Sequence, residues 1–299
     1  MNKKYFANLC FLVLLFFLIS SFGCSTIKSF VYKIESGEPD LKKRVMFLPV
    51  IDQANIGKGL ISYINADLIE NLNKSPQLLL YEYSKTPLDL VKRPPGFGIM
   101  AQPELIEKAD DLDMNAIISG ILNSIEITTK KKGIWPFRKS CWVLETSMIM
   151  NVVDVISKTV LLSHLESYEV SFSFDEAESQ NEKEIFDQAL KKSLPFILKR
   201  QASHLIECLG ERPWTGKILG IDNGTIKINA GKNIGLKPGH RFEVFARGES
   251  IPSAEGRVFF LLGKKMGEIK ASKVLEKHSL AVPVKEGAFL SGQIISSRH

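Results

Sequence analysis

Residues that carry enzyme chemistry are scarce in this sequence. The chain of 299 residues contains only five histidines and four cysteines. It lacks the Gly-x-Ser-x-Gly turn of serine hydrolases, the His-Glu-x-x-His zinc motif and a glycine loop that could cradle a phosphate. We interpret each histidine as a surface or partly packed side chain rather than a metal ligand. They are His164, His204, His240, His278 and His299. We therefore expect no catalytic residue, no metal and no cofactor.

The chain also lacks a strong net charge. Its formal charge is +6, and two of these units come from Lys3 and Lys4 at the start. This excess is too small to predict nucleic-acid binding, which needs a concentrated basic face. Mild basicity would suit an anionic membrane surface nearby. With 44% hydrophobic and 24% charged residues, the composition is that of a globular protein.

The first 23 residues have the pattern of a secretory signal. A short basic start is followed by an apolar run and then by small residues. The segment Ser21-Phe22-Gly23-Cys24 resembles the cleavage site of a bacterial lipoprotein. The resemblance implies that residues 1–23 are removed and that Cys24 carries the lipid, palmitate included. Ser25 resembles the neighbour found in lipoproteins sent to the outer membrane, which implies its periplasmic face.

The alternative is a transmembrane anchor. Residues 5–27 contain no charged side chain, and about 20 apolar residues can span a bilayer. The strongly apolar core, however, covers only residues 9–19. The sequence therefore favours lipidation at Cys24.

Beyond the signal, the sequence predicts a tether and an α/β domain. Residues 24–43 have no sustained period, which indicates a tether. Residues 44–209 are predicted to form a layered α/β domain with a mixed sheet. Strands are expected at 44–51, 78–83, 116–128, 142–155 and 159–170, and a helix at 61–72. A short helix after residue 100 should turn Leu105, Ile106, Ala109 and Leu112 inward. The closing helix at 181–209 contains Pro195, where we expect a kink or a break.

Residues 210–299 predict a small all-β barrel. Asn223-Gly224 is a strong signal for a two-residue hairpin, and Pro238-Gly239 fits a type II turn. About seven short strands are expected, with separate ones at 258–262 and 268–274.

Both domains resemble known families. Segments such as Gly235-Leu236-Lys237-Pro238-Gly239 and Gly287-Ala288-Phe289-Leu290-Ser291-Gly292 are similar in order and spacing to the C-terminal SH3-like barrel of the flagellar assembly protein T family. Residues 45–50, 59–72 and 116–120 resemble the α/β domain of that family's middle region, of the N-terminal part of TolB and of the curli secretion lipoproteins. The resemblance covers nearly all of the chain after residue 43. It implies a binding function, although the chain lacks room for the flagellar protein's separate N-terminal domain.

Two cysteines remain after the signal and the lipid site are set aside. Cys141 and Cys208 would form an even pair in an oxidising compartment, so they could make a disulfide. The alternative is that both are buried thiols that act as small apolar side chains.

Two loops could contact a lipid surface or a partner protein. Residues 130–139 are basic and aromatic, which favours contact with lipid headgroups or with a partner protein. The candidates are Lys131, Lys132, Trp135, Phe137 and Arg138. The alternative is a solvated hairpin tip whose Trp135 folds back. The loop at residues 93–97 either binds a partner or only connects its neighbours.

These features favour a non-enzymatic function. We expect an assembly or scaffold component that is tethered to the lipid bilayer and belongs to an envelope complex. The resemblance implies the flagellar basal body or a related machine. The alternative is a subunit of a curli-type secretion channel, whose hairpins need strands of about 9–11 residues with one apolar face. The chain could also form a homo-oligomer, whereas nucleic acid is not expected as a partner.

Overall fold

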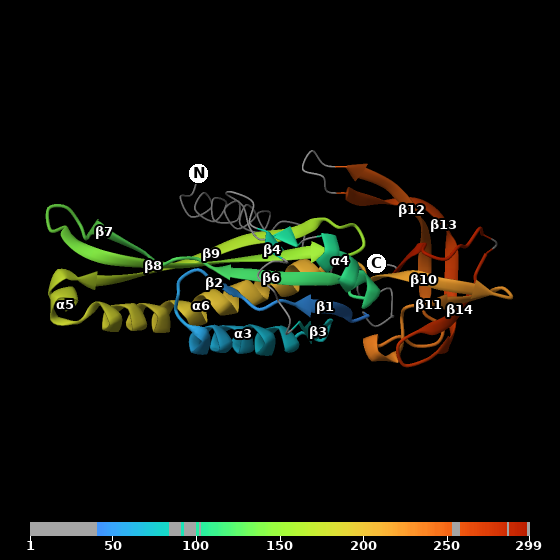
Figure 1. Cartoon of the computed structure of the whole chain (residues 1–299), viewed down its shortest axis with the longest axis horizontal. Coiled ribbons are helices and arrows are strands. Elements are labelled where there is room, and N and C mark those ends of the chain that lie inside the picture. The colour runs from blue at the N-terminus through green and yellow to red at the C-terminus, as the bar shows by residue number, and fades with distance from the viewer. Residues whose placement is uncertain are drawn as a thin grey trace, which may run out of the picture. The chain divides into compact units, whose positions relative to one another are not determined.

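The computed structural model describes residues 41–83, 91–92, 100–101, 103–252, 258–285 and 287–297. The predicted signal, Cys24, most of the predicted tether and the loop at residues 93–97 lie outside these ranges. Within them, no helix combines the length and the apolar character that crossing a membrane requires. The unit Asp40–Arg298 holds an α/β part followed by a barrel (Figure 1).

The α/β part begins with β1 and ends with α6. Its elements are β1 (Lys43–Phe47), β2 (Ile51–Asp52), α3 (Lys58–Asn73), β3 (Leu78–Glu82), β4 (Val91–Lys92), β5 (Met100–Ala101), α4 (Pro103–Asp111), β6 (Ala116–Leu122), β7 (Glu126–Lys132), β8 (Lys139–Asp154), β9 (Val160–Ser173), α5 (Phe174–Ser179) and α6 (Glu182–Gly210). The barrel contains β10 (Thr215–Asp222), β11 (Thr225–Ile228), η2 (Lys232–Ile234), β12 (Arg241–Pro252), β13 (Val258–Val274), β14 (Ser279–Pro283) and β15 (Ile294–Ser297).

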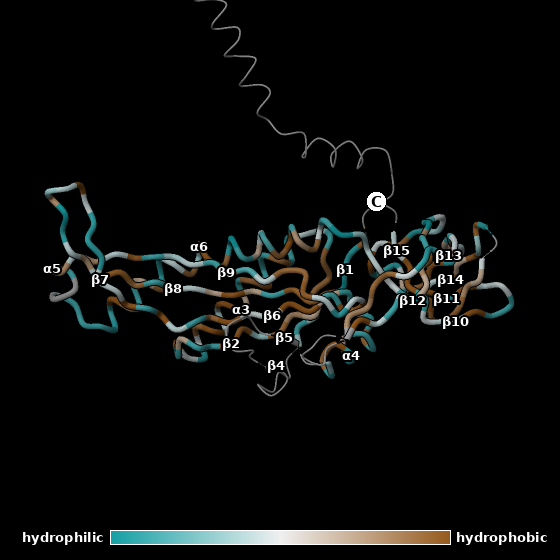
Figure 2. Tube along the Cα trace, turned by 90° about the horizontal axis from the view of Figure 1, so that it is seen from above, coloured by the Kyte–Doolittle hydropathy of each residue, from teal (hydrophilic) through white to brown (hydrophobic). Residues whose placement is uncertain are grey.

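The sheet of the α/β part is mixed. β1 pairs in parallel with β3 and β6, and β2 also pairs in parallel with β6. β8 joins β6 antiparallel, and β9 joins β8 antiparallel. Val45 and Phe47 pack in the same cluster as α3 and α6, whereas Met46 and Leu48 pack with α4. Because both faces of β1 are covered, all five of its residues are buried, and the strand passes from Lys43 and Arg44 into the apolar residues Val45–Phe47 (Figure 2). The prediction of a layered α/β fold with a mixed sheet is confirmed.

β6 and β7 lie one after the other along the same edge of β8. β6 pairs with the second half of β8 and β7 with its first half, while β9 pairs along the other edge. Residues 123–125 separate β6 from β7. Asn123 stays attached to β8 there, since its backbone N donates to Ser147 O and its Nδ2 to Ser147 Oγ, both at 3.0 Å. The prediction of one strand at residues 116–128 was therefore wrong.

The helices differ from expectation in three places. α6 continues through Pro195 without a break, because Leu194, Ile197 and Leu198 are buried around it. α5 was not predicted, and a capping box between Ser173 and Glu176 begins it. Leu112 follows the end of α4 and is 49% exposed, so it does not turn inward as expected.

The barrel is a closed ring of six strands in the order β10-β11-β14-β13-β12-β15. Asn223 and Gly224 both have positive φ, as the predicted hairpin turn requires. Residues 258–274 form one strand, β13, instead of the two that we predicted. The reason lies at Gly263, where an added Cβ would come within 2.6 Å of Ala246 O on β12. Glycine therefore lets the strand continue against its neighbour instead of ending it.

A buried polar network joins the barrel to the α/β part, and we call it the junction. Arg44 is only 4% exposed, and its Nη1 donates to Asn229 O in the barrel at 2.9 Å. Asn115 Nδ2 donates to Thr215 O at 2.6 Å, and Asn229 Nδ2 donates to Asp113 Oδ1 at 2.9 Å. Burial lowers the pKa of Arg44, and the nearby Asp113 carboxylate opposes this shift. Leu41, the first described residue, packs in the barrel core.

Candidate functional site

The β7–β8 hairpin extends the sheet away from the junction. β7 and β8 form seven residue pairs, from Glu126 opposite Glu145 to Lys132 opposite Lys139. Gly133 opens the turn with φ of 115°, and an added Cβ would lie 3.1 Å from Phe137 O. Phe137 N donates to Ile134 O at 2.7 Å and closes the turn. We call residues 130–139 the hairpin tip.

The hairpin tip exposes three large apolar side chains. Ile134 is 85% exposed, Trp135 78% and Phe137 82%. These are the highest values among the large hydrophobic residues in the described ranges. Trp135 therefore does not fold back as the alternative expected, although the hairpin tip is exposed to solvent as that alternative also expected. Burying such a side chain is worth about 1.5–3 kcal/mol, which the isolated fold does not gain at any of the three.

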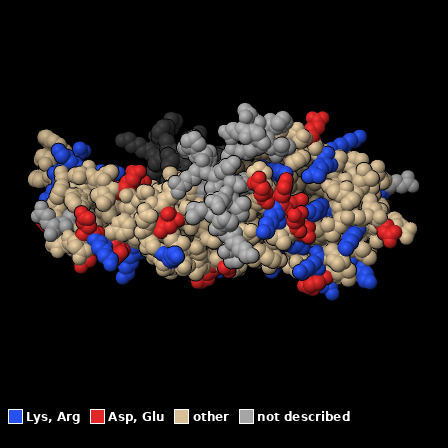
Figure 3. Space-filling model, in the orientation of Figure 1, with Lys and Arg blue, Asp and Glu red and all other residues tan. Residues whose placement is uncertain are grey.

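Positive charge surrounds these apolar side chains. The hairpin tip contains no acidic residue and five basic ones, namely Lys130, Lys131, Lys132, Arg138 and Lys139. Figure 3 shows Lys and Arg side chains gathered at this end of the sheet, at the left of the view. Lys130 Nζ forms an ion pair with Glu169 on β9. This bond raises the pKa of Lys130 and lowers that of Glu169.

The structure thus brings five predicted residues onto one tip. Lys131, Lys132, Trp135, Phe137 and Arg138 all lie on the turn or on the strand ends beside it. Their contact with lipid or protein stays a prediction.

Cys141 and Cys208 do not form the disulfide that we considered. Both thiols are free. Cys141 lies opposite Ser173, just before α5 and α6, whereas Cys208 is in the last turn of α6. At a rise of 1.5 Å per residue, Cys208 lies about 40 Å along α6 from the first residue of that helix. A disulfide needs Cα atoms within about 7 Å of each other. Burial raises the pKa of Cys208, which favours the thiol.

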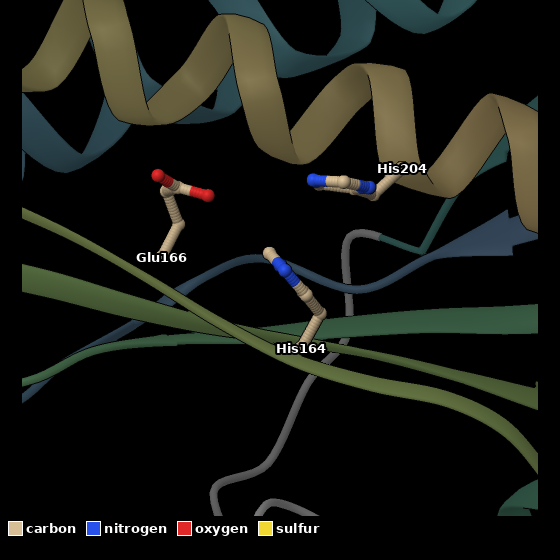
Figure 4. Close-up of side chains that lie close together, drawn as sticks. All are labelled: His164, Glu166 and His204. Atoms are coloured by element: carbon tan, nitrogen blue, oxygen red, sulfur yellow. The ribbon is translucent and has the colours of Figure 1, made fainter. Parts of the chain in front are cut away.

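The structure also assembles a second group of polar side chains, which we call the histidine cluster. His164 and Glu166 lie on β9, and His204 lies on α6. One possible ligand atom from each lies within 4.8 Å of the others. Figure 4 shows the three side chains directed toward a common space between β9 and α6. Our interpretation of these two histidines as scattered side chains missed this proximity.

A sequence signal for the histidine cluster does exist. His164 and Glu166 alternate on β9 with the same period as Leu162 and Tyr168, which face α6. His204 follows Gln201 by three residues on the buried side of α6. The strand and the helix were both predicted, but their mutual placement was not.

Comparison with family models and with curated proteins gives no match for this chain. Among solved structures, a hypothetical protein from Chlamydia trachomatis matches at 16% identity and a TM-score of 0.33, covering 55% of this chain and 98% of that one. A minor lipoprotein from Acinetobacter baumannii matches at 8% identity and a TM-score of 0.28, covering 57% and 92%. A lipoprotein from Neisseria meningitidis matches at 12% identity and a TM-score of 0.26, covering 56% and 98%.

Two of these three structures are thus lipoproteins. Their names give no link to the flagellar assembly protein T family or to curli secretion. With TM-scores this low, no conclusion about function follows from the likeness.

Proposed function

We propose that this chain is a lipid-anchored envelope protein that acts as an assembly or scaffold component. Its anchor is Cys24 at the periplasmic face of the outer membrane, and its hairpin tip docks on an anionic lipid surface. The observation that carries the proposal is the exposure of Ile134, Trp135 and Phe137 beside five basic residues. Among the described residues, these three are the most exposed large apolar side chains.

The composition of the hairpin tip favours lipid over a protein partner. Four of its five basic residues are lysines, and lysine is depleted in protein–protein interfaces. At an anionic bilayer, by contrast, each Lys or Arg near the surface contributes about 1 kcal/mol. Trp135 and Phe137 can then enter the interfacial region, where aromatic side chains are enriched.

A docked tip would fix the orientation of the protein. The described residues begin at Leu41, just before β1, and β1 pairs with β6, which pairs with β8 near Asp154. The hairpin tip lies at the other end of the 16-residue strand β8, which at about 3.3 Å per residue is about 50 Å away. A single lipid attachment does not fix the orientation of a protein, whereas a second attachment at this distance restricts it. The barrel would then be presented to an envelope complex.

The identity of that complex rests on the sequence resemblance alone, which points to the flagellar basal body or a related machine. The curli-type channel is the weaker candidate. The β7–β8 ladder has seven residue pairs, fewer than the 9–11 residues that a spanning strand needs. All seven residues of β7 are exposed, and three of them are lysines.

Vesicle flotation of the whole chain tests the docking step. The Cys24→Ser variant, produced without residues 1–23, lacks both the predicted lipid and the apolar signal segment, so that binding reports the tip. We expect binding to vesicles rich in phosphatidylglycerol and much weaker binding to phosphatidylcholine vesicles. Trp135→Ser with Phe137→Ser should remove the binding, whereas Leu165→Ser, at a 57% exposed residue of β9, should not. Equal binding by the tip variant would contradict the proposal.

A second experiment tests the scaffold role. Envelope complexes, flagellar basal bodies among them, are compared by electron microscopy in cells with and without the protein. We expect a missing or misplaced density when the protein is absent, and a similar defect when only the tip is changed. Unaltered complexes, with no envelope protein captured by the tagged chain, would refute the scaffold role while leaving lipid docking intact.

A further inference from the structure

We propose that the histidine cluster is a zinc site that clamps β9 to α6. Its ligands are one nitrogen each of His164 and His204 and one carboxylate oxygen of Glu166. The inference is independent of the hairpin tip and of the proposed scaffold role.

The three side chains come from two elements that are packed together. His164 and Glu166 alternate on one face of β9, so both point at α6 (Figure 4). His204 faces them from α6, and the two imidazole rings lie with their centroids 4.1 Å apart. Glu166 has a side chain only 9% exposed, whereas that of His204 is 34% exposed. The site is thus sheltered at the carboxylate and open to solvent at one histidine.

Hydrogen bonds from Gln201 decide which ring nitrogen of His164 carries the proton and which is left for a metal. Gln201 is fully buried, and its Nε2 donates to Met148 O at 2.7 Å and to His164 O at 3.1 Å. These two bonds orient the amide, so that Gln201 Oε1 must accept from His164 Nδ1 at 3.3 Å. With its proton on Nδ1, His164 keeps a lone pair on Nε2 for a metal. Outer partners that hold a ligating histidine in this way are typical of metal sites.

His204 has a charged neighbour rather than a hydrogen-bonded outer partner. Its Nδ1 lies 3.9 Å from Glu207 Oε2, a carboxylate that is 68% exposed, and this separation is too long for a hydrogen bond. Of the two histidines, His164 is therefore the one whose ring is oriented by the fold.

Arg200 pairs with one oxygen of the Glu166 carboxylate. Its Nε lies 3.3 Å from Glu166 Oε1, and its side chain is 53% exposed. The ion pair uses one oxygen of Glu166 and leaves the other for a metal. Because Arg200 is exposed, it can also turn into solvent when a cation arrives. Its positive charge opposes a second cation, so removing it should strengthen metal binding.

The donor set favours a transition-metal ion such as zinc over magnesium or calcium. Two imidazole nitrogens and one carboxylate oxygen suit Zn²⁺, whereas Mg²⁺ and Ca²⁺ prefer oxygen alone. In a zinc tetrahedron the ligand atoms lie about 3.4 Å apart, so those here, within 4.8 Å of one another, would draw together by up to about 1.4 Å. Because Gln201 holds the His164 ring, rotation of the more exposed His204 ring and of the Glu166 carboxylate would supply this closure. The fourth position would hold water.

Metal titration of the whole chain, purified without a histidine tag, tests the proposal. We expect one Zn²⁺ per chain and visible absorption of four-coordinate Co²⁺ that Zn²⁺ abolishes. At zinc 100 times above the Kd, Tm should rise by about 5 °C or more, and Mg²⁺ should not change it.

Variants assign the binding to these residues. Glu166→Gln and His204→Ala should each weaken zinc binding about 100-fold or more, since changes of outer partners alone cost 10- to 100-fold. Arg200→Met should strengthen it. His278→Ala, which removes a histidine from the barrel, is the matched control and should bind zinc normally. If Glu166→Gln fails to fold, the zinc affinity of His204→Ala decides the assignment. The His204 side chain is partly exposed, so its removal should leave the fold intact.

The proposal is overturned if the unmodified chain shows neither the cobalt spectrum nor the Tm shift. It is also overturned if His204→Ala binds zinc as tightly as the control.

Discussion

The two halves of β8 belong to one strand but lie in different surroundings. From Met148 to Asp154 the strand pairs with β6 and β9, and Met148, Met150 and Val152 lie in the main core. From Lys139 to Glu145 it pairs with β7, whose seven residues are all exposed. At the junction end the fold buries its apolar groups, and Arg44, Asn115 and Asn229 make hydrogen bonds between the two parts. At the hairpin tip it leaves three large apolar side chains in water. The difference teaches that packing within the chain explains one end of β8 but not the exposed apolar side chains at the other.

Among changes that distinguish the two ends, the largest loss of stability is expected at the junction. Arg44→Met leaves Asn229 O without the 2.9 Å bond that it accepts and removes a charged donor from a buried site. We expect a loss of about 3 kcal/mol in the free energy of unfolding, measured by urea denaturation. Arg241→Met, at an exposed arginine that begins β12, should change it by less than about 0.5 kcal/mol. Equal losses would contradict a stabilising junction.

A smaller effect is expected at the turn of the hairpin. Gly133→Ala places a Cβ at φ of 115° and 3.1 Å from Phe137 O. We expect a loss of about 1 kcal/mol, because only the turn has to adjust. Amide exchange should become faster in β7 and the first half of β8, with the second half unchanged. Uniformly faster exchange would show that the hairpin is coupled to the core.

The apolar tip residues should matter least for stability. Changing Ile134, Trp135 and Phe137 together to serine should alter the free energy of unfolding by less than about 0.5 kcal/mol, since all three are exposed. Vesicle binding by the same variant should be lost. A large loss of stability would mean that the tip packs against part of the chain and is not a docking surface.

The smallest difference expected between the two ends is that the stability of the hairpin depends on pH. Lys130 lowers the pKa of Glu169 below its ordinary value of 4.5. The bond therefore stabilises the hairpin above pH 4.5, and its contribution is lost as the pH falls through the lowered pKa. The protection of the β7 amides, measured relative to their intrinsic exchange rate at each pH, should fall in that acidic range, and Lys130→Ala should remove the dependence. A persistent dependence in the variant would assign it to another carboxylate.

Local patterns predicted the fold better than they predicted the candidate sites. The apolar period of α3 and the Asn223-Gly224 turn are decided by neighbours in sequence, and the structure confirms both. The single strand β13 depends on how closely Gly263 approaches Ala246, which no local pattern reveals. The exposure of Trp135 depends on how far β7 and β8 extend beyond the core.

The histidine cluster shows the same limit. His164 and His204 are separated by 40 positions, and only the packing of α6 against β9 brings their rings together. Sequence could place each histidine on its element but not the two elements on each other.

Leu41 has a mechanical consequence. Its side chain lies in the barrel core, and Lys42 N donates to Ile234 O at 2.9 Å. Any pull on the chain from its N-terminal side therefore reaches the barrel before it reaches β1. β1 itself is hydrogen-bonded in parallel to β3 and β6, so a force along its axis loads those bonds in shear, all at once. An anchor on that side would therefore load the barrel contacts of Leu41 and the β1 ladders before any force reached the hairpin tip.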